Sequence, residues 1–184
     1  MTPTEVLRHE HQIVLLILEA AEREAQSIKD TGEARAKDLE KMIDFFRNFT
    51  DRCHHAKEEK HLFARMQERG MSRDAGPIPL MRHEHEEGRA KVKAMAEALP
   101  RARKGDVAAL KSLRESLLAY VKLLRSHIEK EEKVLFPMAD QLLPAGDQRA
   151  LERAFEKVEA EEMGEGVHEK YHQLAHDLAG REKP

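Results

Sequence analysis

Two stretches of the sequence repeat the same pair of chemically active side chains. They read HHAKEEKHLF (residues 54–63) and HIEKEEKVLF (residues 127–136). Aligned on Glu-Glu-Lys, each stretch has a histidine four residues before a glutamate: His54 with Glu58, and His127 with Glu131. Residues four apart lie on the same face of a helix, so each stretch presents an imidazole and a carboxylate to one point. Two such pairs facing each other in a helical bundle predict a site for two metal ions.

Helical phase predicts which other histidines face the same interior, because successive residues of a helix are about 100° apart. His11 lies in line with the leucine and valine side chains of its segment, and His85 with the methionines and valine of its own. His9 and His83 each lie two residues before the inward-facing histidine, which is about 200° away around the helix. We therefore expect His11 and His85 to point inward and the other two histidines to face water.

The segment around residue 54 leaves an alternative open. Phase alone does not separate His54 with Glu58 from His55 with Glu59. The internal alignment favours the first pair, because its glutamate matches Glu131 of the other stretch. The second pair remains the alternative, and His61, one turn further on, could line the same cavity.

The resulting donor set is rich in imidazole and carboxylate. Imidazole suits iron, manganese and zinc, and a carboxylate can bridge two cations. Cys53 is the only cysteine, which excludes an internal disulfide and a thiolate cage. The imidazole N–H groups need acceptors, for which Glu10, Glu59 and Glu132 are the candidates. The predicted metal ligands are His11, His54, Glu58, His85, His127 and Glu131.

Five helices are expected to position these residues, over about residues 2–29, 34–68, 78–103, 106–143 and 147–178, the last interrupted near residues 164–166. Thr2, Asp106 and Asp147 are expected to cap helices, and Pro137 to bend one. Short links favour antiparallel neighbours. We therefore predict an all-α fold. Residues 1–143 form an up-down-up-down four-helix bundle, and residues 144–184 form a C-terminal helical extension packed on it.

Composition limits the classes of function. The chain has 184 residues, of which 36% are charged and 4% aromatic, with a net charge of −3. The charges are intermixed, so neither a basic face for nucleic acid nor an acidic tail is predicted. The longest apolar run, Ile13 to Leu18, is too short to span a bilayer, so no membrane association is expected. No signal-peptide pattern is present at the start, and a cytoplasmic location is expected.

Four segments, in this order, resemble the hemerythrin-like (HHE cation-binding) family. They are Glu10-His11, HHAKEEKHLF, GPIPLMRHEHEEGR (residues 76–89) and HIEKEEKVLFP (residues 127–137), and the resemblance covers about residues 5–142. It implies two non-haem iron ions, oxo- or hydroxo-bridged, inside a four-helix bundle, with manganese or zinc as other options. It also implies histidines as terminal ligands, Glu58 and Glu131 as bridges, and a small diatomic or peroxide ligand.

The sequence departs from the oxygen-carrying hemerythrins in two places. They have His-x3-His on the third helix, whereas the residue four after His85 here is Arg89. Its side chain either pairs with a carboxylate or lies on the surface, and the surface is favoured. They have His-x4-Asp on the fourth helix, whereas His127 is followed by Glu131 and Glu132. One imidazole fewer leaves an open position on one metal, as in catalytic sites. Chemistry on oxygen, peroxide or nitric oxide is therefore favoured over reversible oxygen carriage. Non-catalytic binding, storage or sensing of iron or oxygen is the alternative, and the sequence leaves open whether the protein is an enzyme.

Two further expectations concern side chains outside the donor set. Gly88, one turn after His85, either leaves room for a small ligand or allows close helix packing. Tyr171 belongs to an apolar stripe and is expected to face the bundle. The histidines spaced by four beside it should face solvent: His168, His172 and His176.

Overall fold

The computed structural model describes residues 1–164 and 166–180, and its described residues contain helices and no strand. This confirms the predicted all-α class. The elements in chain order are α1 (Pro3–Thr31), α2 (Ala36–Phe45), η1 (Phe46–His55), η2 (Glu58–Leu62), α3 (Phe63–Glu68), α4 (Pro77–Ala102), α5 (Val107–Lys130), η3 (Glu131–Leu135), α6 (Phe136–Leu142), α7 (Ala145–Val158), η4 (Glu159–Met163) and α8 (Val167–Ala179).

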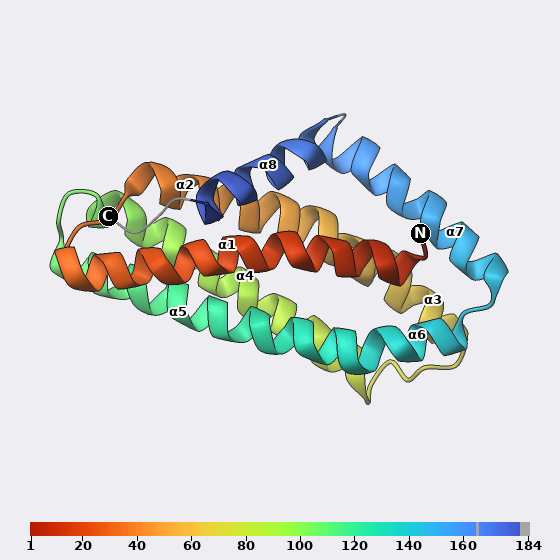
Figure 1. Cartoon of the computed structure of the whole chain (residues 1–184). Coiled ribbons are helices and arrows are strands. Elements are labelled where there is room, and N and C mark those ends of the chain that lie inside the picture. Colours follow the sequence, from red (N-terminus) through yellow and green to blue (C-terminus); the bar gives the residue numbers. More distant parts are fainter. Residues whose placement is uncertain (165, 181–184) are drawn as a thin grey trace.

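Four rods form the bundle (Figure 1): α1, the run from α2 to α3, α4, and the run from α5 to α6. Short loops join them, and consecutive rods run in opposite directions, as expected. The chain then turns at Pro144 into α7, and α8 returns along the bundle and packs against α1. The last helices therefore cover the side where α1 meets η1. The division of the chain at residue 143 into bundle and extension stays a prediction.

The helix ends follow largely from local sequence. Thr2 accepts a hydrogen bond from the Glu5 backbone N–H while the Glu5 side chain accepts from the Thr2 N–H, a capping box that begins α1. Asp106 caps α5 as predicted. The predicted cap at Asp147 is wrong. Helix α7 begins directly after Pro144, and the Asp147 carboxylate accepts a 2.6 Å hydrogen bond from Arg69 Nε instead.

Three π-helical segments interrupt the ligand-bearing rods: η1, η2 and η3. In a π-helix the backbone bonds run from i to i+5, which widens the turn, and such turns are frequent at functional sites. The segment η3 ends immediately before Phe136-Pro137, where the sequence predicts a bend. His54 and Glu131 lie within these widened turns.

The apolar core is divided into two clusters along the bundle. The larger cluster surrounds Phe45, Phe46 and Phe49, and the smaller one surrounds Phe63 and Phe136. The buried polar side chains of the sequence motifs lie between the two in every rod. The middle of the bundle is therefore a polar layer enclosed at both ends by hydrocarbon.

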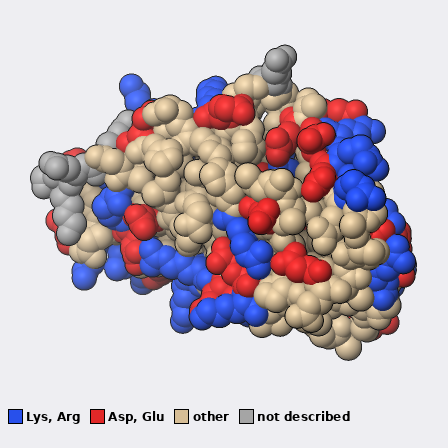
Figure 2. Space-filling model, turned by 45° about the vertical axis from the view of Figure 1, so that its right-hand side comes forward, with Lys and Arg blue, Asp and Glu red and all other residues tan. Residues whose placement is uncertain are grey.

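The outer surface carries side chains of both charges. On the face drawn in Figure 2, lysine and arginine side chains gather at the right-hand edge and at the lower left, with aspartate and glutamate side chains beside them. None of the described helices combines the length and apolar character that crossing a membrane requires.

Candidate metal centre

All six predicted ligand residues meet in the polar layer. They come from all four rods, and none of the six side chains is more than 2% exposed. Their donor atoms, together with those of His55, fall into two groups, in each of which the atoms lie within 4.8 Å of one another. The groups are His11, His54, Glu58 and Glu131, and His55, Glu58, His85 and His127.

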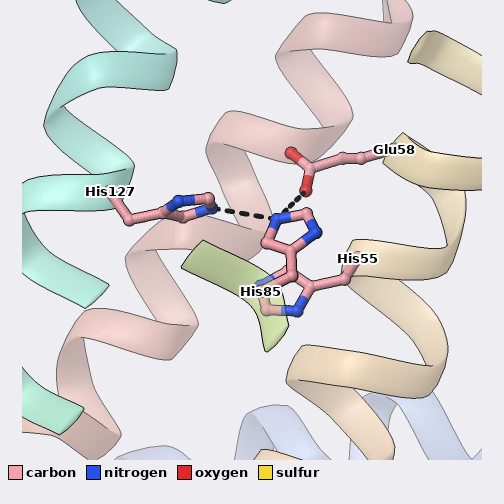
Figure 3. Close-up of side chains that lie close together, drawn as sticks. All are labelled: His55, Glu58, His85 and His127. Atoms are coloured by element: carbon pink, nitrogen blue, oxygen red, sulfur yellow. Dashed lines mark hydrogen bonds and ion pairs between the residues drawn. The ribbon is translucent and has the colours of Figure 1, made fainter. Parts of the chain in front are cut away.

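Glu58 belongs to both groups. Its Oε1 lies 3.6 Å from His54 Nε2, and its Oε2 lies 3.5 Å from His85 Nε2. Figure 3 shows this carboxylate pointing from its helix toward His85, which also faces His127. One carboxylate therefore spans two imidazoles from different rods, which is the arrangement needed to bridge two cations.

Glu131 repeats this geometry from the opposite rod. Its Oε2 lies 3.2 Å from His11 Nε2, and its Oε1 lies 3.2 Å from His127 Nε2. Burial opposes charge on both rings, but the adjacent carboxylates outweigh it and raise the pKa of His11 to about 9 and that of His127 to about 10. The site is thus strongly anionic and attracts positive charge.

Carboxylates outside the groups contact Nδ1 of the four histidines that were predicted as ligands. The Nδ1–oxygen distances are 2.9 Å for His54 and Glu10, 3.0 Å for His11 and Glu132, 2.6 Å for His85 and Glu59, and 2.9 Å for His127 and Glu84. Because Nδ1 of each ring faces a carboxylate, Nε2 is the nitrogen that points into the polar layer, where a bound metal ion would replace its proton. The ring orientation that a metal requires is therefore already set.

These outer carboxylates follow a repeat in the sequence. Glu10-His11 of α1 matches Glu84-His85 of α4, 74 residues later, and Glu59 matches Glu132, 73 residues later. Glu10, Glu59 and Glu132 were predicted to be acceptors, and their contacts confirm this. Glu84 was missed, although the repeated Glu-His pair was a signal that could have identified it.

His55 and Glu59, the alternative pair, have different positions in the structure. Glu59 lies outside the groups, where hydrogen bonds from His85 and Arg89 overcome the effect of burial and lower its pKa to about 2. His55 is 3% exposed and stacks on His85, with ring centroids 3.8 Å apart and planes 12° from parallel. Burial and the neighbouring imidazoles hold the pKa of His55 well below its usual value. His54 and His55 thus both face inward.

A buried lysine connects the centre to the last helices. Lys57 Nζ lies 2.5 Å from Glu10 Oε1 and 2.5 Å from Glu159 Oε1, and His168 Nε2 lies 3.1 Å from the same Glu10 oxygen. Burial disfavours the ammonium, but the charge of Glu10 outweighs it and raises the pKa of Lys57 to about 12. Although Glu10, Glu159 and His168 are close enough to hold a metal ion, the Lys57 ammonium already neutralises the carboxylates.

The histidines of α8 do not all follow the prediction. His168 and His172 are half-buried, because α8 lies against the bundle and the two rings contact Phe49. Only His176 of the three is exposed as expected. Tyr171 faces the bundle as predicted, but its hydroxyl donates to Asp44 at 2.7 Å, away from the donor groups.

Arg89 and His61 also correct the sequence analysis. Arg89 is half-buried, and it donates hydrogen bonds to Asp51, Glu59 and Glu86, so its expected place on the open surface is wrong. His61 contacts Phe155 and belongs to neither donor group. Gly88 packs closely, since a Cβ atom there would touch the Tyr120 ring at 3.4 Å, and the residue also lines a pocket.

Similar sequences place this site in a family. The uncharacterized protein Mb2018 of Mycobacterium bovis and the uncharacterized protein Rv1995 of Mycobacterium tuberculosis are each 24% identical to this chain over 165 residues. The alignment covers 90% of this chain and 64% of each relative, so the chain spans less than two thirds of their length. No solved structure gives a significant match. Residues 2–139 match the hemerythrin HHE cation binding domain. The chain therefore belongs to the hemerythrin HHE cation-binding family of helical, metal-binding domains.

Proposed function

We propose that this protein holds two non-haem iron ions in the polar layer and there binds or transforms a small ligand such as oxygen, peroxide or nitric oxide. The observation that carries the proposal is that Glu58 and Glu131 each contact two imidazoles. Each of these carboxylates places its two oxygens against imidazoles of different rods. This arrangement suits two cations that lie close enough together for one carboxylate to bridge them.

The donor set fits such a pair. Both oxygens of Glu58 and of Glu131 lack a hydrogen-bond partner among the described residues, although all four are buried. His85 Nε2 lies only 3.1 Å from His127 Nε2, while Nδ1 of each ring faces a carboxylate, so the two Nε2 atoms that a metal ion would bind face each other. Buried carboxylates without hydrogen bonds cost free energy, even beside imidazole rings. Cations between them would remove that cost.

The residues divide naturally between two ions. His11 and His54 would hold one ion, His85 and His127 the other, and both carboxylates would bridge. Each ion would then have two imidazoles and two carboxylate oxygens, which leaves positions for an external ligand. Bound iron would supply Lewis acidity and electrons for that ligand. Manganese and zinc accept the same donors.

The chain's own contribution is orientation and exclusion of water. The outer carboxylates orient the imidazole rings, and the two apolar clusters close the polar layer at both ends. Lys57 balances Glu10, so the hydrogen bond to His54 is held by a fully buried ion pair. These contacts would keep the donors in place through a cycle of ligand binding.

Elemental analysis and an electronic spectrum of protein from iron-supplied cells test the proposal. We expect two iron ions per chain and absorption typical of a bridged di-iron centre. Well under one iron per chain would refute the proposal. Peroxide breakdown above that of free iron, lost in His127→Ala, would identify an enzyme. A reversible oxygen-dependent spectrum without turnover would identify a binding or sensing module.

Glu84, the acceptor that the sequence analysis missed, gives a sharper prediction. Glu84→Gln should weaken metal binding about 10- to 100-fold, because outer carboxylates contribute affinity of this size through the imidazole that they hold. Manganese(II) titration of chelator-treated protein measures the change. Glu87→Gln, an exposed position on the same helix, is the control and should bind like the wild type. Equal affinity in both variants would contradict the assigned role.

A further inference from the structure

A pocket of about 200 Å³ connects the surface with one of the two donor groups. Its outer part is lined by exposed Arg47 and Lys93, and its inner part by buried His55 and His85. The rest of the lining includes apolar Phe46, Val92 and Tyr120, together with the ion pair of Arg89 and Asp51. The pocket is smaller than the roughly 300–1,000 Å³ typical of sites for larger organic ligands. It therefore suits a molecule of a few atoms.

The internal repeat shows that this pocket is specific to one half of the bundle. His55 corresponds to Ile128, and Gly88 corresponds to Val14, when the two halves are aligned on their ligand histidines. Ile128 and Val14 are both buried. In the half with the pocket, a polar ring and a missing side chain thus replace two apolar side chains. The two ends of the donor site differ where a ligand would arrive.

The geometry of His55 argues against a role as a metal ligand beside His85. A metal bound to an imidazole nitrogen lies in the plane of that ring, along the lone pair. The ring centroids of His55 and His85 are 3.8 Å apart and the ring planes are nearly parallel. Figure 3 shows the two side chains close together. A single metal ion therefore cannot lie in both ring planes and also within bonding distance of a nitrogen of each ring. His55 therefore stands beside the metal position of His85 and not in line with it.

His55 is nevertheless free to bind something polar. Neither ring nitrogen has a hydrogen-bond partner among the described residues, and the ring is buried at the inner end of the pocket. The nearest carboxylate oxygen, Asp51 Oδ1, is 3.5 Å from Nδ1, outside hydrogen-bonding geometry. A buried imidazole with two unused nitrogens is costly unless a partner arrives.

We propose that the pocket is the route by which a small ligand reaches the ion held by His85 and His127, and that His55 donates a hydrogen bond to that ligand. This inference rests on the proposed di-iron function. The ligand class is a two- or three-atom molecule with an oxygen or nitrogen acceptor. His55 would face this ligand, and the matching position in the other half of the bundle is Ile128.

Azide binding to the iron-loaded protein tests the role of His55. His55→Ile, which copies the residue of the other half, should keep the iron content of the wild type and weaken azide binding about tenfold, equivalent to about 1.4 kcal/mol. The azide stretching frequency should shift as well, because a hydrogen bond is lost. His55→Gln, which still carries an N–H donor, should recover most of the affinity. His61→Ile, outside the pocket, is the matched control.

The outcomes separate the inference from the function on which it rests. Loss of iron in both His55 variants would make His55 a metal ligand and overturn the inference. Full iron content with unchanged azide affinity and frequency would overturn it too. A wild-type protein without iron would instead refute the proposed function itself.

The route can be tested separately. Val92→Phe should fill the pocket and slow azide association several-fold without changing the iron content, whereas Val92→Ala should not slow it. An unchanged rate in the Phe variant would show that the ligand enters elsewhere.

Discussion

Replacing Glu58 by glutamine is expected to abolish the binding of both metal ions. Glu58 is the residue shared by the two donor groups, with one oxygen toward His54 and the other toward His85. Glutamine keeps the shape but offers a single neutral oxygen, so it cannot bridge two cations or balance their charge. Metal analysis after dialysis should show a drop from two ions to fewer than one per chain, with unchanged helical circular dichroism.

Glu59→Gln is the matched control, because the neighbouring carboxylate contacts His85 Nδ1 from outside the groups. Its loss should weaken binding about 10- to 100-fold and leave the stoichiometry intact at saturating metal. If Glu58→Gln retained two ions, or if the two variants behaved alike, Glu58 would not be a bridge. The assignment of a two-metal site would then have to be abandoned.

Replacing Lys57 by methionine should destabilise the fold by about 3–5 kcal/mol, because it leaves the buried carboxylate of Glu10 without its counter-charge. Lys57 is fully buried, and its ammonium joins Glu10 of α1 to Glu159 of η4. Methionine fills similar space, so packing changes little and the lost charge dominates. Urea unfolding of chelator-treated protein measures the effect without a contribution from metal binding.

Lys130→Met provides the control that the repeat supplies. Lys130 corresponds to Lys57 and pairs with Glu84, but its side chain is 34% exposed. The Lys130 ammonium is already partly solvated, and the buried Glu84 carboxylate keeps its hydrogen bond from His127, so the expected loss is smaller, about 1 kcal/mol. Similar losses in the two variants would show that the covering α7–α8 segment does not isolate the Lys57 pair from solvent.

The positions of the six inward residues could be predicted because the information is local. In a long amphipathic helix the position of a residue relative to the apolar stripe decides whether it faces the core. His11 and His85 lie on such stripes, and the repeated His-x3-Glu pairs needed only a helical turn to align. Thr2 and Asp106 were predictable for the same reason, since a cap is formed within three residues.

The ambiguity between His54 and His55 could not be resolved in this way. Both lie in the π-helical segment η1, whose wider turn changes the angle between successive residues, so both rings point inward. A wide turn is stabilised by the packing of neighbouring rods, and no local sequence pattern specifies it. The role of His55 therefore depended on seeing its ring stacked on His85.

The sequence by itself determined the helical class and the donors that face the interior, because spacing along a helix sets which side chains share a face. Only the tertiary structure decided which charges neutralise one another. Glu84 meets His127 across 43 residues, Lys57 meets Glu159 across 102, and His168 meets Glu10 across 158. Such pairs form where distant rods exclude water together, and burial makes each charge dependent on a partner that helical spacing cannot reveal.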